Sequence, residues 1–278
     1  MSADPAQHGI IEGRYDPNVA RVFRLIARRM LRKKFHAARI TPGSLERLDA
    51  AANHDGPVVV CMTHAGWWDP MIGLLLHIER FDQKLRRAGG PARAGIAPID
   101  RAVLANVGIF KKLGLFGIDP DDPASKGALV EFAVGTMRDQ HLPTLWITPQ
   151  GRFQDPRDAM EIRPGVSAIL SRLENPQVLI LASEYPFWDD QKPEMLAHIT
   201  EIERPERTTT AGWHRAVASA MPAAANKLAA LAITRNAANF ETLLGDSGGM
   251  TFPLYDVYLR LTGRSTDAIR TRTKESLQ

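Results

Sequence analysis

The chain has 278 residues, of which 44% are hydrophobic and 24% charged, an ordinary composition for about two globular domains or one large domain with appendages. Its single cysteine, Cys61, excludes an intrachain disulfide and a zinc site built on several thiolates. The net charge is only +4, so charge alone does not indicate a nucleic-acid partner.

Residues 1–42 form a first segment, whose main feature is a predicted helix from Asp16-Pro17 to about Arg39. Asp at the N-cap followed by Pro is a typical helix start. One stripe of the helix is apolar, and basic residues surround it: the stripe is Val19, Val22, Phe23, Ile26 and Met30, and the basic residues are Arg21, Arg24, Arg28, Arg29, Arg32, Lys33 and Lys34. A basic amphipathic helix favours a membrane surface, and the alternative is a core-packed helix with a solvated polar face.

Residues 43–205 alternate between short apolar runs and helical patterns. The predicted strands are Pro57–Thr63, Ala94–Ile99, Leu115–Ile118, Thr144–Thr148 and Gln177–Ser183, and the predicted helices are Asp69–Phe81, Arg101–Lys112, Asp121–Gln140 and Pro164–Leu173. Strands that alternate with helices of this length predict an α/β fold with a mostly parallel central sheet flanked by helices.

Residues 206–278 form the third segment, predicted as a helical appendage with a polar tail. An alanine-rich helical stretch runs over 211–244, broken only at Met221-Pro222. A turn is predicted at Asp246–Gly249, a last helix at Tyr255–Leu261, and a polar tail from Gly263. The sequence contains no apolar run near the roughly 20 residues of a membrane span, and no signal peptide is expected, so we predict peripheral binding at most.

The sharpest candidate site is the segment from Thr63 to Pro70, directly after a predicted buried strand. Ligands of open α/β sheets bind at the carboxyl ends of the strands. His64 and Asp69 would point about 140° apart on an ideal helix, so they meet only across a turn, which Gly66 permits. An Asp beside a His makes the imidazole a better general base. Alternatively, Asp69-Pro70 is a simple helix start and His64 a loop residue.

The motif His-x-x-x-x-Asp after a buried strand resembles the first motif of the glycerolipid acyltransferases, the lysophospholipid (1-acylglycerol-3-phosphate) acyltransferase family. The later motifs follow in order: Lys112–Asp119 is similar to the second motif, Ile147–Arg152 to the third, Arg163–Val166 to the Lys-x-Gly-Val run after it, and Val178–Ala182 to the apolar fourth. The resemblance covers about Pro57 to Ser183.

This resemblance implies transfer of a fatty acyl group from acyl-CoA or an acyl-carrier protein to a hydroxyl of a lipid acceptor. It implies His64 as the general base and Asp69 as the residue that orients it. Substrate-binding positions would be Gln150, Gly151, Arg152, Arg163, Gly117 and Asp119, with backbone N–H groups near Gly151 facing the oxyanion. No metal and no cofactor are expected, and His77 lies too far past Asp69 to complete a metal site with His64.

The chain departs from the family pattern at several positions. Thr63 stands where the family often has Asn, Gln150 replaces a Glu, and Arg152 lies one position early. Pro120 replaces an Arg that grips the acceptor phosphate, and two carboxylates, Asp121 and Asp122, follow it. Carboxylates repel phosphate, so we expect an acceptor with less phosphate at that subsite, such as a neutral lipid or glycolipid hydroxyl.

Two other functions stay open at this stage. The departures at Gln150 and Pro120 are compatible with a catalytically silent module that binds a lipid or an acyl carrier. An acyl-thioester hydrolase is less favoured, because no Gly-x-Ser-x-Gly elbow supplies a nucleophile. Nucleic-acid binding is not expected, since the basic cluster lies on one helix without a recognition motif. We predict a cytoplasmic protein on the inner membrane face.

Overall fold

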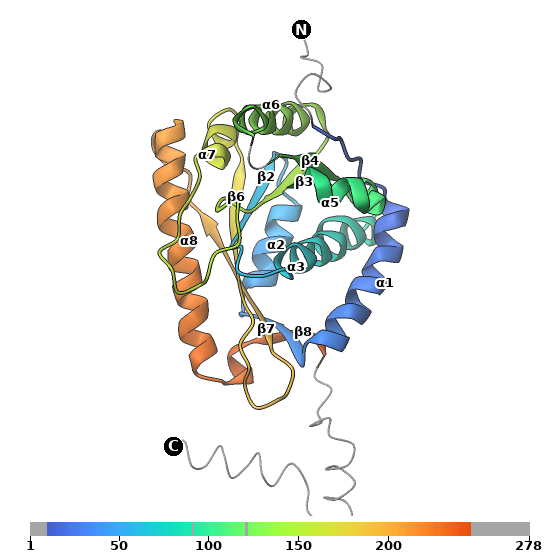
Figure 1. The fold of residues 1–278 in the computed structure, drawn as a ribbon, viewed down its shortest axis with the longest axis vertical. Helices are drawn as coiled ribbons and strands as arrows, with labels where there is room; N and C mark the ends of the chain where they lie inside the picture. The colour runs from blue at the N-terminus through green and yellow to red at the C-terminus, as the bar shows by residue number, and fades with distance from the viewer. Residues whose placement is uncertain (1–9, 91, 120–121, 246–278) are drawn as a thin grey trace, which may run out of the picture.

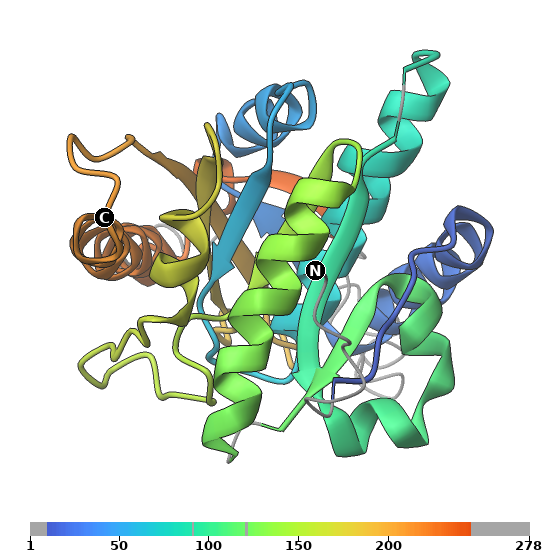
Figure 2. The same ribbon diagram turned by 90° about the horizontal axis from the view of Figure 1, so that it is seen from above.

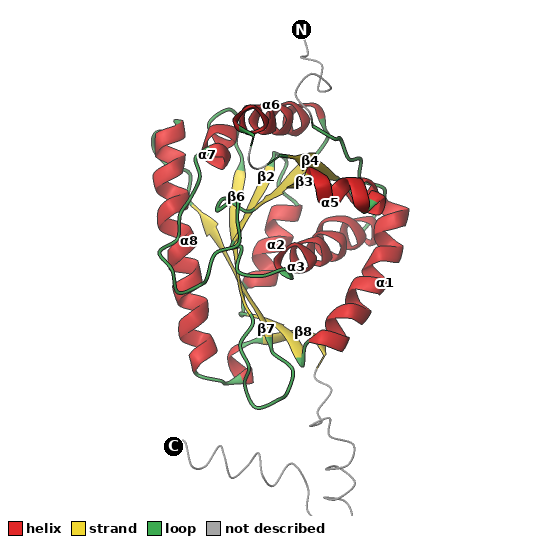
Figure 3. Ribbon diagram, viewed as in Figure 1, coloured by secondary structure: helices red, strands yellow, loops and turns green. Residues whose placement is uncertain are grey.

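The computed structural model describes residues 10–90, 92–119 and 122–245. It confirms an α/β fold with one mixed, mostly parallel sheet flanked by helices (Figures 1 and 3). The sheet is eight-stranded, in the order β4-β3-β5-β2-β6-β7-β1-β8, and the antiparallel neighbours are β6 with β7 and β1 with β8. The strands are β1 (Ala37–Ile40), β2 (Val58–Met62), β3 (Ala94–Asp100), β4 (Leu115–Ile118), β5 (Pro143–Ile147), β6 (Gln177–Glu184), β7 (Met195–Ile202) and β8 (Glu241–Gly245).

Helices cover both faces of the sheet (Figure 2). The α-helices are α1 (Pro17–Lys34), α2 (Ser44–Ala52), α3 (Asp69–Leu76), α4 (Lys84–Arg87), α5 (Arg101–Asn106), α6 (Pro123–Asp139), α7 (Gly165–Leu170) and α8 (Thr210–Ile233). The π-helix His77–Gln83 joins α3 to α4, and short 3₁₀ helices span Gly108–Leu113 and Ala237–Asn239. Among the described helices, α1, α2 and α3 lie on one face, and α6, α7 and α8 on the other.

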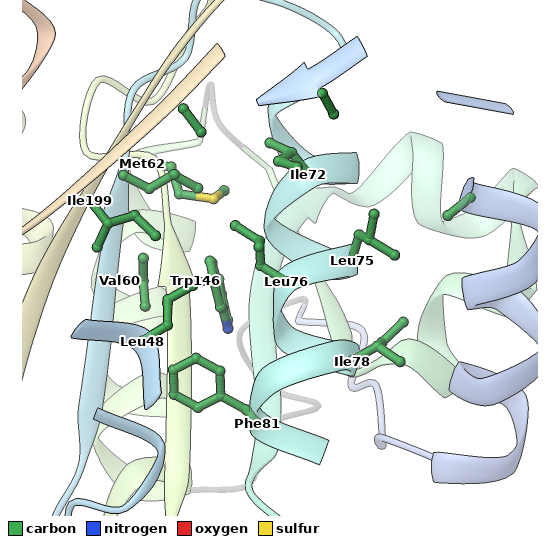
Figure 4. Packing of buried hydrophobic residues seen from close by; sticks show 14 of the residues in the cluster. Leu48, Val60, Met62, Ile72, Leu75, Leu76, Ile78, Phe81, Trp146 and Ile199 are labelled. Atoms are coloured by element: carbon green, nitrogen blue, oxygen red, sulfur yellow. The ribbon is translucent and has the colours of Figure 1, made fainter. Parts of the chain in front are cut away.

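The central strand β2 divides the core into two layers. Its residues are all buried, and alternate side chains point to opposite faces. Val60 and Met62 pack with α3 and the following π-helix, as Figure 4 shows, whereas Val59 and Cys61 pack beneath α6, α7 and α8. Because β5, β2 and β6 are parallel neighbours, their carboxyl ends lie at the same edge of the sheet.

The N-terminal helix is shorter than the sequence predicts. It ends at Lys34, Phe35 takes an extended conformation, and Ala37–Ile40 joins the sheet as β1. Its buried side chains are Ala20, Phe23, Ala27 and Leu31. The predicted apolar stripe therefore divides: Phe23 enters the core, and Val22, Ile26 and Met30 remain exposed.

The C-terminal segment also differs from its prediction. Helix α8 continues through Pro222, because buried residues on both sides of it, among them Met221 and Ala224, pack against the same face of the molecule. It ends at Ile233 rather than Leu244, and Glu241–Gly245 forms β8. All three predicted segments thus contribute strands to one sheet. The predicted turn at 246–249, the helix at 255–261 and the polar tail lie outside the described residues.

Within the described part of the chain, α8 is the one helix with the length and apolar composition of a membrane span. Core helices of soluble proteins pass the same test, so this indication is weak. Residues spaced along one face, including Trp213, Val217 and Leu228, are buried toward β6, β7 and α7.

Candidate active site

The segment after β2 forms a tight turn at the carboxyl edge of the sheet. Its backbone closes through a hydrogen bond from Asp69 N–H to the Gly66 carbonyl oxygen, 3.2 Å long. Ser183 and Tyr185 reach the same place from the end of β6, and the loop over residues 148–164 reaches it after β5. Three neighbouring parallel strands therefore supply the site, as expected for an open α/β sheet.

The turn brings His64 and Asp69 together. His64 Nδ1 lies 3.4 Å from Asp69 Oδ2, and the Asp69 side chain is 1% exposed. Gly66 N–H donates to the same Oδ2 over 2.7 Å. Asp69 does not cap the helix, because the N-cap residue of α3 is Trp68 and no side chain caps there. The alternative of a simple helix start therefore does not describe what this carboxylate does.

Two hydroxyl groups hold the other oxygen of the Asp69 carboxylate. Ser183 Oγ and Tyr185 OH both donate to Asp69 Oδ1. Burial, followed by the charge of Asp69, raises the pKa of Tyr185, so this hydroxyl stays a proton donor. Neither residue was predicted in this role from the sequence; the available signal was that Ser183 ends the last predicted strand and Tyr185 comes shortly after it.

The backbone of His64 is held from the loop after β5. His64 N–H donates to Gln150 Oε1 over 2.7 Å, and the His64 carbonyl accepts from Gln154 N–H over 2.9 Å. Gln150 Nε2 also donates to Gln154 Oε1. Gln150 was predicted to bind substrate. In the structure its side chain is 4% exposed and holds the backbone of His64.

The imidazole of His64 is open on one side. Phe153 lies over it, with ring centroids 4.2 Å apart and an angle of 32° between the planes. The His64 side chain is 15% exposed. Its Nδ1 is buried beside Asp69, whereas Nε2 has no partner among the described residues and is not fully buried. This nitrogen is therefore available to an incoming group.

Gly151 has a structural role that the sequence analysis did not predict. Its φ is +65°, a backbone conformation that favours glycine, and the Arg163 side chain lies against its open side. Its N–H donates to the Thr148 carbonyl over 2.9 Å. The Gly151 N–H is thus already used in this conformation, and the expectation that backbone N–H groups near Gly151 face an oxyanion stays a prediction.

The two predicted arginine contacts differ in their surroundings. Arg152 Nη2 donates to Glu161 Oε2 over 2.7 Å, and both side chains are exposed. Arg163 is also exposed, lies against Gly151, and forms no ion pair or side-chain hydrogen bond with any described residue. Of the two, Arg163 has the cation free for an anionic ligand.

Gly117 and Asp119, the other two predicted site residues, do not lie on a strand next to the one that carries His64. They belong to or follow β4, the edge strand, which β3 and β5 separate from β2. Gly117 is buried against Ile11, Arg101 and Leu104, so it is a packing position. Pro120 and Asp121 lie outside the described residues, and Asp122 caps α6 by accepting from Ala124 N–H.

No cluster of three His, Cys, Asp or Glu side chains that could hold a metal ion occurs in the described ranges. Cys61 is buried beneath the sheet, and burial raises the pKa of its thiol to about 12, so it is a poor nucleophile. Neither a scan against models of known protein families nor a search of curated proteins finds a match to this chain.

Proposed function

We propose that this protein is an O-acyltransferase that moves a fatty acyl group from acyl-CoA or an acyl-carrier protein to a hydroxyl of a lipid acceptor. One observation carries the proposal: His64 directs Nδ1 toward a buried carboxylate and leaves Nε2 unpartnered at the carboxyl edge of the sheet. This is the arrangement of a general base. The sequence motifs around it resemble those of the glycerolipid acyltransferases.

The reaction follows from that geometry. Nε2 takes the proton of the acceptor hydroxyl while the acceptor oxygen forms a bond to the thioester carbonyl carbon. The C–S bond then breaks, and the thiolate that leaves takes the proton back from the imidazolium. Asp69 stabilises the imidazolium between these steps. The Nδ1–Oδ2 separation of 3.4 Å is long for a hydrogen bond, and such contacts commonly tighten when substrate binds.

Side chains around His64 suit an acyl thioester. Phe153 and Trp67 are both largely exposed beside the catalytic turn, and their rings would contact an acyl chain. Arg163, with its free cation, would meet a phosphate of the donor. No cofactor and no metal are needed for this chemistry. We keep the expectation that the acceptor carries little phosphate.

We place the enzyme on the cytoplasmic face of a membrane through α1. The helix exposes an apolar row of Val22, Ile26 and Met30, with Leu25 beside it. Five exposed cations on α1 have no partner among the described residues: Arg21, Arg29, Arg32, Lys33 and Lys34. A bilayer with anionic lipids satisfies both features, whereas a second copy of α1 would add like charges. Phe35, directly after α1, is buried and contacts Trp68 and Tyr185, so the end of α1 lies near the turn that carries His64 and Asp69.

Vesicle flotation tests the membrane proposal. We expect binding to vesicles of phosphatidylcholine with phosphatidylglycerol, and loss of binding when salt is raised. Ile26→Gln, and separately Arg29→Gln with Lys33→Gln, should each weaken binding about tenfold or more. The matched controls are Ile233→Gln, an exposed apolar residue on α8, and Arg87→Gln, an exposed cation on α4. Equal loss in the controls, or no binding without salt, would contradict the proposal.

Thiol release from long-chain acyl-CoA and from acyl-carrier protein tests the chemistry. We expect release that requires a hydroxyl lipid, that favours neutral acceptors over lysophosphatidic acid, and that disappears in His64→Ala. Release without an acceptor would indicate the hydrolase instead. No release from either donor, with binding retained, would indicate the silent binding module.

A further inference from the structure

The contacts of Asp69 divide cleanly between its two oxygens. Among the residues that the structure describes, Oδ1 accepts from two groups, the hydroxyls of Ser183 and Tyr185. Oδ2 accepts from Gly66 N–H and faces His64 Nδ1. No Lys or Arg of the described ranges contacts this buried carboxylate. Its orientation therefore depends on the two hydroxyl donors at one end and the turn at the other.

Ser183 is itself fixed by the residue before His64. Ser183 N–H donates to Thr63 Oγ1 over 3.0 Å, and the two hydroxyl oxygens lie 3.3 Å apart. Because Ser183 Oγ–H is directed to Asp69, the Thr63 hydroxyl donates to Ser183 Oγ. Thr63, one of the departures from the family pattern, thus orients the Ser183 hydroxyl.

The ring of Tyr185 packs against two neighbours, Gly66 and Phe35. A Cβ added at Gly66 would lie 3.0 Å from Tyr185 Cε2, so the ring covers the catalytic turn where glycine has no side chain. The second neighbour is Phe35, at a centroid distance of 5.7 Å, and Phe35 in turn packs edge-on against Trp68. The hydroxyl therefore reaches Asp69 from a ring with little freedom to move.

We propose that Tyr185 and Ser183 are positioning residues that hold Asp69 Oδ1, so that Oδ2 faces His64 and selects the imidazole tautomer with the proton on Nδ1. In that tautomer Nε2 carries the lone pair that accepts a proton. If the carboxylate rotates away, the imidazole loses the partner that fixes its tautomer. The effect on rate rests on the proposed function, but the effect on the tautomer does not.

Nitrogen-15 NMR of the imidazole ring tests this directly, since protonated and unprotonated ring nitrogens have different chemical shifts. At a pH where His64 is neutral, the wild type should show its proton on Nδ1, with the His64→Gln spectrum used for assignment. Tyr185→Phe keeps the ring and removes only the hydroxyl. It should shift population to the Nε2-protonated form and lower kcat about three- to tenfold, with KM for the donor unchanged.

Tyr15→Phe is the matched control, because Tyr15 OH also donates to a buried carboxylate, Asp82 Oδ2, over 2.9 Å. It should leave the His64 shifts unchanged. Ser183→Ala provides the same test through the second donor if Tyr185→Phe does not fold. Unchanged ring-nitrogen shifts in Tyr185→Phe and Ser183→Ala would overturn the proposal, as would an equal change in Tyr15→Phe or a wild type with its proton on Nε2. These shifts decide the question even if no acyl transfer is found.

Discussion

The chain contains His-x-x-x-x-Asp twice, at His64 and Asp69 and again at His77 and Asp82, and each Asp accepts a hydrogen bond from a tyrosine. The two pairs differ in whether the His faces its own Asp and in which groups the Asp contacts. The first spans a turn, and its His faces its Asp. The second lies on the π-helix His77–Gln83; His77 Nδ1 accepts from Trp146 Nε1 over 3.1 Å, and Asp82 pairs with Arg86.

The difference lies in what neutralises each buried carboxylate. Asp82 already has a cation, Arg86, within its own helical segment. Asp69 has none among the described residues except the neighbouring imidazole. A buried carboxylate without a fixed cation stabilises a proton on the histidine beside it, so the first pair can hold a transferred proton and the second has no need of one. Identical spacing therefore places a histidine against a buried carboxylate in one case and in core packing in the other.

The largest expected effect separates the two histidines. His64→Ala should lower acyl-transfer kcat/KM by roughly 10²–10⁴-fold, because it removes the base. His77→Leu should leave turnover per folded molecule within about twofold, since His77 is 2% exposed and touches no reacting group. Steady-state kinetics and circular dichroism on both variants provide the check. Comparable losses of turnover would show that the two pairs are not distinct.

A second comparison replaces the carboxylate of each pair by an amide. Asp69→Asn should lower kcat by about 10²-fold, because an amide neither fixes the His64 tautomer nor stabilises the imidazolium. Asp82→Asn should leave kcat nearly unchanged and reduce the free energy of unfolding by about 1 kcal/mol, since its partner Arg86 is 46% exposed. Kinetics and urea denaturation of the two variants measure both quantities. A kcat loss in Asp82→Asn as large as in Asp69→Asn would remove the distinction.

A smaller effect is expected from the support beneath His64. Gln150→Leu removes the acceptor of His64 N–H and should lower kcat/KM about tenfold. Gln150→Glu replaces the amide oxygen by a carboxylate oxygen that can also accept from His64 N–H, and should retain most of the activity. Measuring both variants separates a positioning role from a substrate contact. If Gln150→Glu loses as much activity as Gln150→Leu, Gln150 does more than hold the backbone.

These comparisons also show which parts of the structure the sequence can predict. Strands β2 and β6 are continuous apolar runs, so their signal is local and their prediction held. The residues of strand β1 were predicted as part of a helix, because Ala37 and Ala38 suit either structure. The strands that pair with it, β7 and β8, lie far along the chain, so no local pattern reveals them. The helix break predicted at Pro222 was wrong, because tertiary packing of α8 outweighs the local preference of proline.

The site divides in the same way. His64 and Asp69 are five residues apart by sequence number, and the turn between them is predictable from Gly66. Ser183 lies 114 positions from Asp69, so only the pairing of β2 with β6 reveals its contact. Gln150 lies in the segment that resembles the third motif, but its burial and its bond to His64 depend on how the loop after β5 folds back. A second His-x-x-x-x-Asp shows that spacing without such context does not identify a site.

The last comparison concerns the effect of His77 on stability at different pH, where no change in turnover is expected. Burial, followed by the charge of Arg93, lowers the pKa of His77 from its ordinary value of 6.5 to about 3. Between these values the unfolded chain binds more protons than the folded one, so stability is lost as pH falls from about 6.5 toward 3. His77→Leu should flatten this slope by up to about 1.4 kcal/mol per pH unit in urea denaturation. His198, whose pKa burial lowers to about 4, contributes equally to both proteins and cancels. An unchanged slope would mean that His77 takes up its proton in the folded state, as the histidine of a catalytic pair does, and the two motifs would then be more alike than their contacts indicate.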